Sequence, residues 1–163
     1  MSLILTKYIK NLFMFRGVHT ISIDNKGRIK IPSRHHELII NACDGRMILS
    51  IHPEDDCLLL YPLADWQKLE FKVGALPSLN IHTKRLKRKL IGHATECEMD
   101  KVSRILIPIK LREYAKIDKK VILSGQGNNF EIWNEATWNK HIDNLDSLSK
   151  REELPPEISQ LSL

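Results

Sequence analysis

The chain has 163 residues, enough for one mid-sized domain or two small ones. Its 42% hydrophobic and 28% charged residues are typical of a folded globular protein and argue against intrinsic disorder. The formal net charge of +5 favours an anionic partner, most commonly nucleic acid. Two segments carry this charge. Residues 1–41 hold seven Lys and Arg against two acidic residues, and residues 84–89 hold Lys84, Arg85, Lys87, Arg88 and Lys89.

The three cysteines Cys43, Cys57 and Cys97 are widely spaced and form no C-x-x-C pair. This spacing argues against a disulfide framework or a zinc ribbon and favours a reducing cytoplasm. No run of 18 apolar residues is present, so we expect no membrane-spanning segment. Residues 1–13 lack the apolar core and cleavage site of a signal peptide, and we interpret them as an N-terminal extension ahead of Met14.

The first predicted strand covers His19 to Ile23, where apolar and polar residues alternate. It leads into a tight turn at residues 24–27, because Asn25 and Gly27 tolerate positive φ. A return strand over residues 28–31 ends at a proline. Ser33 is then the expected N-cap of a short helix, and strands at 47–51 and 58–61 complete this half of the chain.

The middle of the chain, from Leu63 to Gly92, is predicted to be mostly helical with a break at residues 74–77. The helix expected over Ile81 to Leu90 carries the basic stretch Lys84 to Lys89. That stretch could face DNA, but such runs are more often solvated helix faces, and both interpretations stay open.

The second half of the chain repeats the first. Asp100 to Pro108 matches Asp24 to Pro32 as D-x-x-x-R-[hydrophobic]-x-I-P, at an offset of 76 residues. Predicted strands at 121–124 and 130–133 follow, and then a helix through Trp138 to about Leu148 and an acidic tail after Pro155-Pro156. A four-stranded unit of about 45 residues is too small to be stable alone. We therefore expect the two halves to share a core as a pseudo-dimer.

The repeated motif supplies groups that suit DNA. Arg28 and Arg104 could approach phosphates or a guanine edge. The other candidate contacts would bind the DNA backbone and so position the protein without reading the sequence; they are Arg16, Lys26, Lys30 and Lys101. In one interpretation, Asp24 and Asp100 only pair with these arginines and thereby hold each turn in shape. Alternatively, they could orient the arginines while the outer face of each guanidinium meets DNA.

Other chemistry is weakly supported by the sequence. No nucleophile, base and orienting residue come together around Ser33 or Ser103, so we expect no enzyme, no cofactor and no metal. His93 and Cys97 have the i, i+4 spacing of a metal edge on a helix, but no second pair accompanies them. We expect His35 and His36 at surface or cap positions. The three tryptophans, Trp66, Trp133 and Trp138, are expected in the core or at a subunit interface, and residues 125–129 form a hairpin loop.

Taken together, these motifs resemble the MraZ family from about Met14 to Trp138. The matching segments are Met14 to Gly17, the two D-x-x-x-R motifs, Leu59 to Pro62 before Trp66, Gly92 to Ala94, and Gly125 to Trp133. The family normally begins at the position of Met14, so residues 1–13 depart from it.

The resemblance implies an α+β fold of two tandem swapped-hairpin AbrB-like β-barrel domains that form a pseudo-dimer. The domains would cover residues 14–66 and 94–138, with a helical linker at 67–93 and a C-terminal helix and acidic tail at 139–163. It also implies a ring-like homo-oligomer that binds double-stranded DNA at short direct repeats upstream of the division and cell-wall gene cluster. Such a protein would act in the cytoplasm, at the nucleoid, chiefly as a repressor that includes its own operon among its targets. Arg28 is the best-matched DNA contact by this resemblance, and Arg104 is its counterpart. The alternative is a protein-binding adaptor of the same fold, whose binding would depend little on salt.

Overall fold

The computed structural model describes residues 14–148 and 155–161. The predicted extension at 1–13 and the acidic residues Glu152 and Glu153 lie outside the described residues. The first half contains β1 (Val18–Ser22), β2 (Arg28–Lys30), α2 (Ser33–Cys43), β3 (Arg46–Ile51), β4 (Leu58–Pro62), α3 (Leu63–Gly74), α4 (Ile81–Leu86) and the π-helix η1 (Lys87–Ile91). The second half contains β5 (Thr95–Glu98), β6 (Arg104–Leu106), α5 (Ile109–Tyr114), β7 (Lys120–Gly125), β8 (Phe130–Asn134), α6 (Glu135–Leu148) and α7 (Pro156–Ser159).

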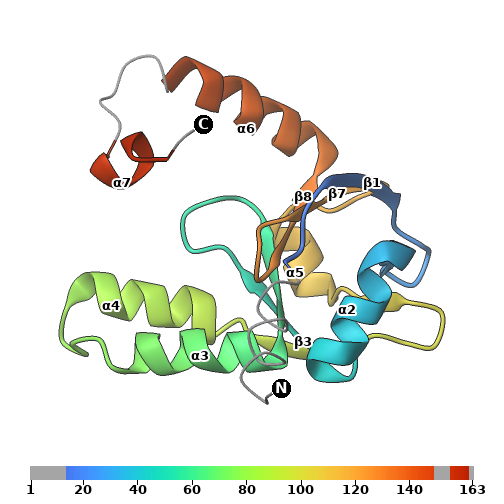
Figure 1. The fold of residues 1–163 in the computed structure, drawn as a ribbon, viewed down its shortest axis with the longest axis horizontal. Coiled ribbons are helices and arrows are strands. Elements are labelled where there is room, and N and C mark those ends of the chain that lie inside the picture. The colour runs from blue at the N-terminus through green and yellow to red at the C-terminus, as the bar shows by residue number, and fades with distance from the viewer. Residues whose placement is uncertain (1–13, 149–154, 162–163) are drawn as a thin grey trace, which may run out of the picture.

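The sheet is built from strands of both halves (Figure 1). Its six strands run in the order β1-β7-β8-β4-β3-β5, and each neighbouring pair is antiparallel. Strand β1 of the first half pairs with β7 of the second, with Val18 opposite Ser124, while β5 of the second half pairs with β3 of the first. Among the described residues no ladder joins the edge strands β1 and β5. The sheet is therefore open, and the closed barrels expected from the sequence are not found.

The predicted hairpin has its turn at residues 24–27, but the two strands on either side of that turn barely pair with each other. A single bridge joins Ile23 to Ile29, and β2 pairs instead with β6 of the other half. A three-residue strand leaves most of its backbone donors and acceptors unpaired unless another strand supplies partners. The other half supplies them here, so the two turns are tied together.

Both copies of the repeated motif contribute equally to one core. Ile29 and Ile31 of the first copy and Ile105 and Ile107 of the second are fully buried. They pack with apolar side chains from the central strands, among them Leu49, Leu60, Leu123 and Ile132. Each such side chain contributes about 1.5–3 kcal/mol on burial. The expectation of a core shared by the two halves is confirmed in this respect.

Helices α2 and α5 both begin directly after the proline of the motif. Pro32 and Pro108 occupy the N-cap positions with extended backbone, and neither helix has a side-chain cap. Ser33 is the first helical residue rather than the N-cap, which corrects the sequence-based assignment. The proline ring fixes φ near the value that the cap needs, so the cap moves one residue earlier than the serine suggests.

Helices α3, α4 and η1 form a helical arm on one side of the sheet, interrupted as expected after Gly74 (Figure 1). Trp66 anchors the arm, because it is 2% exposed and packs edge-on against Tyr61 with ring centroids 5.7 Å apart. Trp133 is likewise buried, and Trp138 packs against it from α6. The prediction that the tryptophans are core residues is confirmed for Trp66 and Trp133. Across the described ranges, no helix has the length and apolar character needed to cross a membrane.

Candidate nucleic-acid interface

The carboxylate of Asp24 organises the first turn. Its Oδ1 accepts hydrogen bonds from the backbone N–H groups of Lys26 and Arg28, both at 2.9 Å, and its Oδ2 accepts one from Nε of Arg28 at 2.7 Å. The backbone donor of Arg28, followed by its side chain, lowers the pKa of Asp24 and keeps the carboxylate charged. The guanidinium is thus held at Nε, and its Nη groups remain available for another acceptor.

The second turn repeats this geometry although its three central residues all differ from those of the first. Asp100 accepts from the backbone N–H groups of Val102 at 3.0 Å and Arg104 at 2.8 Å, and from Nε of Arg104 at 2.8 Å. Its pKa is lowered for the same reasons. Ser103 takes the positive φ, 65°, that Gly27 takes in the first turn at 83°. Ser103 therefore gives the second turn the same backbone shape without a glycine.

The paired strands β2 and β6 form a two-stranded ribbon with a cationic outer face. Ile29 opposite Ile105 points into the core, so the alternate residues, Arg28, Lys30, Arg104 and Leu106, face outward. Lys30 lies directly opposite Arg104. Like charges opposite each other in an antiparallel pair are destabilising. We call this surface, made by Arg28, Lys30 and Arg104, the basic ribbon.

The other predicted contacts differ in their distance from the basic ribbon. Lys26 and Lys101 lie exposed in the two turns beside it. Arg16 lies elsewhere, at the far end of β1, where Phe15 and Gly17 hydrogen-bond to Gly127 and Gly125 of the β7–β8 hairpin. The structure therefore brings together five of the six predicted cations and separates Arg16 from them.

Part of the basic stretch Lys84 to Lys89 is occupied within the fold. Arg85 forms an ion pair with Glu54 at 2.7 Å, and Nζ of Lys89 donates to the carbonyl of Pro53 at 3.1 Å. Two of the five cations therefore fasten the loop after β3 to the helical arm. This favours a structural role for the stretch over a DNA-facing one.

The structure corrects the prediction for His35 and also bears on the weakly supported metal edge of His93 and Cys97. His93 precedes β5 and its Nδ1 contacts the carbonyl of Lys89, whereas Cys97 lies within β5, so the pair is not an edge of one helix. His35 is 2% exposed rather than superficial. Its ring packs edge-on against Phe15 and Phe130, and its Nε2 lies 3.3 Å from Nε2 of His19. The aromatic neighbours come from β8 and the segment before β1, which local sequence cannot place beside α2.

Two residues contact the turns in a way that the sequence did not predict: His36 was expected only at a surface or cap position, and Arg112 was given no role. His36 of α2 bonds through Nδ1 to Oγ of Ser103 at 2.6 Å, and Arg112 of α5 lies against Gly27. Each therefore lies against the turn of the opposite half, and of the two only His36 is held there by a hydrogen bond that the structure shows. The repeat offset of 76 residues relates His36 to Arg112 and was the signal that could have identified them.

Fold and site together define a two-repeat α+β protein whose paired turns present a basic ribbon. The sequence profile described as "MraZ protein, putative antitoxin-like" matches the chain twice, over residues 14–89 and 90–155. The chain belongs to the MraZ family.

Relatives from several bacteria are similar over most of the chain, and each is named "Transcriptional regulator MraZ". The protein of Halorhodospira halophila is 45% identical over 152 residues, which cover 92% of this chain and 100% of the relative. That of Methylococcus capsulatus is 46% identical over 152 residues, covering 91% and 99%. That of Pseudomonas aeruginosa strain LESB58 is 44% identical over 151 residues, covering 92% and 100%.

Proposed function

We propose that this chain is a DNA-binding transcriptional regulator that contacts duplex DNA through the basic ribbon and its two turns. The observation that carries the proposal is Lys30 directly opposite Arg104, with Arg28 on the same outward face. Asp24 and Asp100 each pair with one arginine, but the ribbon and its two turns hold five cations against these two carboxylates, so the binding of an anion there is favourable. Two-stranded ribbons fit the major groove, where an arginine can reach a guanine edge. The exposed Lys26 and Lys101 would contact phosphates on either side.

Within that function we propose the swapped-hairpin pseudo-dimer as the DNA-binding unit, with domains at residues 14–66 and 94–138. The exchange of strand partners between halves supports it. We further propose a non-enzymatic repressor that binds short direct repeats upstream of its own operon and the division and cell-wall gene cluster, in the cytoplasm at the nucleoid. The names of the relatives support transcriptional regulation, and two related turns in one chain suit a repeated DNA target.

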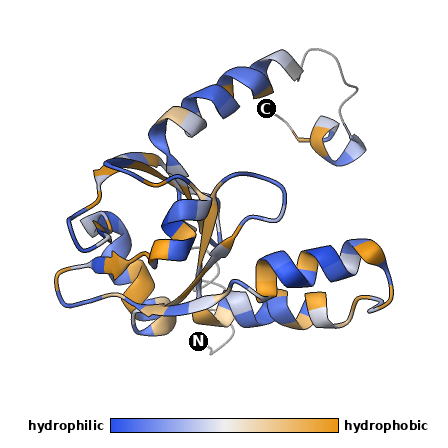
Figure 2. Cartoon of the chain, turned by 180° about the vertical axis from the view of Figure 1, so that it is seen from behind, coloured by the Kyte–Doolittle hydropathy of each residue, from blue (hydrophilic) through white to orange (hydrophobic). Residues whose placement is uncertain are grey.

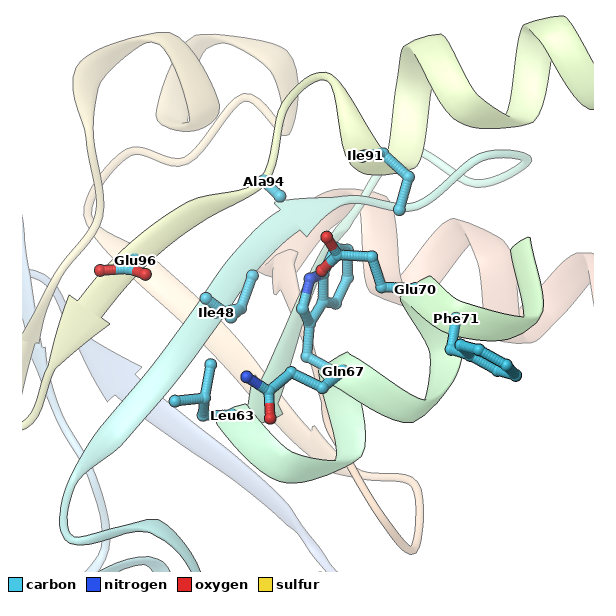
Figure 3. A pocket seen from close by; sticks show the side chains of 9 residues that line it. Ile48, Leu63, Gln67, Glu70, Phe71, Ile91, Ala94 and Glu96 are labelled. Atoms are coloured by element: carbon cyan, nitrogen blue, oxygen red, sulfur yellow. The ribbon is translucent and has the colours of Figure 1, made fainter. Parts of the chain in front are cut away.

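We propose that the protein acts as a ring-like homo-oligomer. The tip of the helical arm is apolar at the surface (Figure 2): Leu79 is 87% exposed and Ile81 70%. An open cavity of about 630 Å³ lies between α3 and the strands β3 and β5, lined among others by Ile48, Leu63, Phe71 and Ile91 (Figure 3). Its lining mixes these apolar side chains with Gln67, Glu70 and Glu96, and an open cavity of this kind beside an edge strand could receive a second subunit. Light scattering at micromolar concentration is expected to give a mass several times 18.9 kDa, and a stable monomer would contradict this.

The direct test of DNA binding is Arg28→Ala. We expect this variant to bind DNA from upstream of its own gene about 10- to 100-fold more weakly, because the guanidinium oriented by Asp24 is lost. The measurement is a gel-shift titration at physiological salt. Lys140→Ala, which removes an exposed cation on α6, is the matched control and should bind like the unchanged protein.

The same titration separates a DNA regulator from a protein-binding adaptor of the same fold. Affinity for DNA falls steeply with salt, because every neutralised phosphate releases counterions. Unchanged affinity of Arg28→Ala, with an intact oligomer, would count against the proposed interface. Loss of solubility in that variant would instead show that the Asp24–Arg28 pair serves mainly to hold the turn.

A further inference from the structure

The strongest unexplained feature near the two turns is the guanidinium of Arg112. It extends from α5 of the second half onto the first turn, whose Gly27 carbonyl accepts a hydrogen bond from the backbone N–H of Ile107 at 2.9 Å. Its Nε is buried and has no hydrogen-bond partner. In the described part of the chain, no carboxylate forms an ion pair with Arg112. This one nitrogen of the guanidinium has lost water without gaining an acceptor among the described residues.

The glycine of the first turn makes this position possible. A Cβ on Gly27 would lie 2.7 Å from Cζ of Arg112 and 2.9 Å from both Nε and Nη2. The planar guanidinium therefore rests on the bare backbone of the turn, with its Nη groups as the part that can meet a ligand. A side chain at residue 27 would displace it.

The second turn lacks this feature, although the repeat provides the same two positions. There Ser103 replaces the glycine and His36 replaces the arginine, and their side chains hydrogen-bond to each other at 2.6 Å. The polar group above the second turn is thus satisfied within the protein. Only the first turn combines an unpaired cation from the opposite half with the Asp24–Arg28 pair.

We propose that Arg112 and Arg28 together form a phosphate-binding site at the first turn, which takes one phosphodiester of the DNA backbone. This inference rests on the proposed function. Arg112 would supply a charge-assisted hydrogen bond from its Nη groups to a phosphate oxygen. Because a phosphate carries no base identity, Arg112 would contribute affinity and register rather than sequence preference. The two turns would therefore be unequal in DNA binding despite their shared backbone.

The test compares Arg112→Gln with two matched variants. His36→Gln changes the equivalent residue above the second turn without removing a fixed charge, and Lys140→Gln removes an exposed charge far from the turns. Affinities are measured by fluorescence anisotropy over a range of salt, for DNA from upstream of the gene and for a random duplex. Thermal unfolding of each variant is recorded in parallel.

We expect Arg112→Gln to weaken binding to both duplexes by a similar factor of roughly 10 and to reduce the slope of log K against log salt by about 1. Its melting temperature should not fall, since no internal partner is lost. His36→Gln and Lys140→Gln should keep the slope of the unchanged protein. Unchanged affinity and slope in Arg112→Gln, with Arg28→Ala still defective, would overturn the inference and leave the proposed function standing. Absence of salt-dependent binding by the unchanged protein would overturn both.

A second measurement covers the case in which Arg112→Gln fails to fold. In the unchanged protein, the Nε–Hε resonance of Arg112, assigned with Arg112→Lys, should shift on addition of DNA. Arg112→Lys keeps the positive charge and serves only for the assignment, and a resonance that DNA leaves in place would overturn the inference.

Discussion

Gly27 and Ser103 show that one backbone shape can be reached with two different residues. Both have positive φ, which costs a residue with a Cβ roughly 1–2 kcal/mol. Ser103 offsets this cost with its bond to His36. Gly27 adopts the conformation without that cost and leaves room for Arg112. The two residues therefore differ in what they allow above the turn, although the turns themselves are alike.

His35 is the buried ionisable residue that should make the stability of the fold depend on pH. Burial, and then the charges of His19 and Arg34, lower its pKa to about 4 from 6.5. Between these two values the unfolded chain binds a proton that the folded protein does not. The stabilisation is therefore fully present above pH 6.5 and declines as the pH falls towards about 4.

We predict that the melting temperature falls between pH 7 and 4.5, and falls less in His35→Phe, whose ring cannot take up a proton. Thermal unfolding followed by circular dichroism at several pH values checks this. The exposed His82, changed to Phe, is the control and should keep the pH dependence of the unchanged protein. An identical decline in the His35 variant would assign the effect to other groups.

At the scale of elements, α3 is held by one side chain. Trp66 is almost fully buried against Tyr61 and the apolar side chains of the helical arm, while Phe71 on the same helix is 80% exposed. We predict that Trp66→Ala lowers the free energy of unfolding by about 3–5 kcal/mol. Lys72→Ala, at an exposed position of the same helix that does not line the cavity, should change it by less than about 0.5 kcal/mol. Urea titration measures both, and similar values for the two variants would contradict this account of the arm.

Most elements could be predicted from the sequence because their signals are local. Alternation at His19 to Ile23 identified β1, and the prolines of the motif marked where β2 and β6 end. The partners of those strands could not be predicted in the same way. Nothing within β1 specifies β7 rather than β2, since the choice depends on which pairing buries the isoleucines of both halves together.

The candidate site was predictable to a similar degree. Residues within one turn, such as Asp24 and Arg28, are tied by their spacing, and the structure shows their hydrogen bonds. Arg112 and His36 reach their turns across the two halves, so only the repeat offset could have pointed to them. Arg16 is basic and near in sequence, yet β1 carries it away from the basic ribbon.

At the scale of the whole molecule, the two halves depend on each other. Strands β1 and β2 both take their partners from the second half, and β5 takes its partner from the first. We predict that residues 14–89 alone do not fold as a monomer, and that mixing them with residues 90–163 restores a folded complex. Circular dichroism and amide spectra of each fragment and of the mixture test this. A dispersed spectrum and cooperative melting of monomeric 14–89 would contradict it.

The pairing of Val18 with Ser124 also sets an order of events during synthesis. A ribosome adds about 5–20 residues per second, so β1 leaves the exit tunnel on the order of 5–20 s before its partner strand does. During that interval β1 has no neighbour from its own chain that can complete the sheet. The first half of this protein is therefore synthesised before the strands that it must pair with. A nascent chain interrupted before β7 cannot form the native sheet.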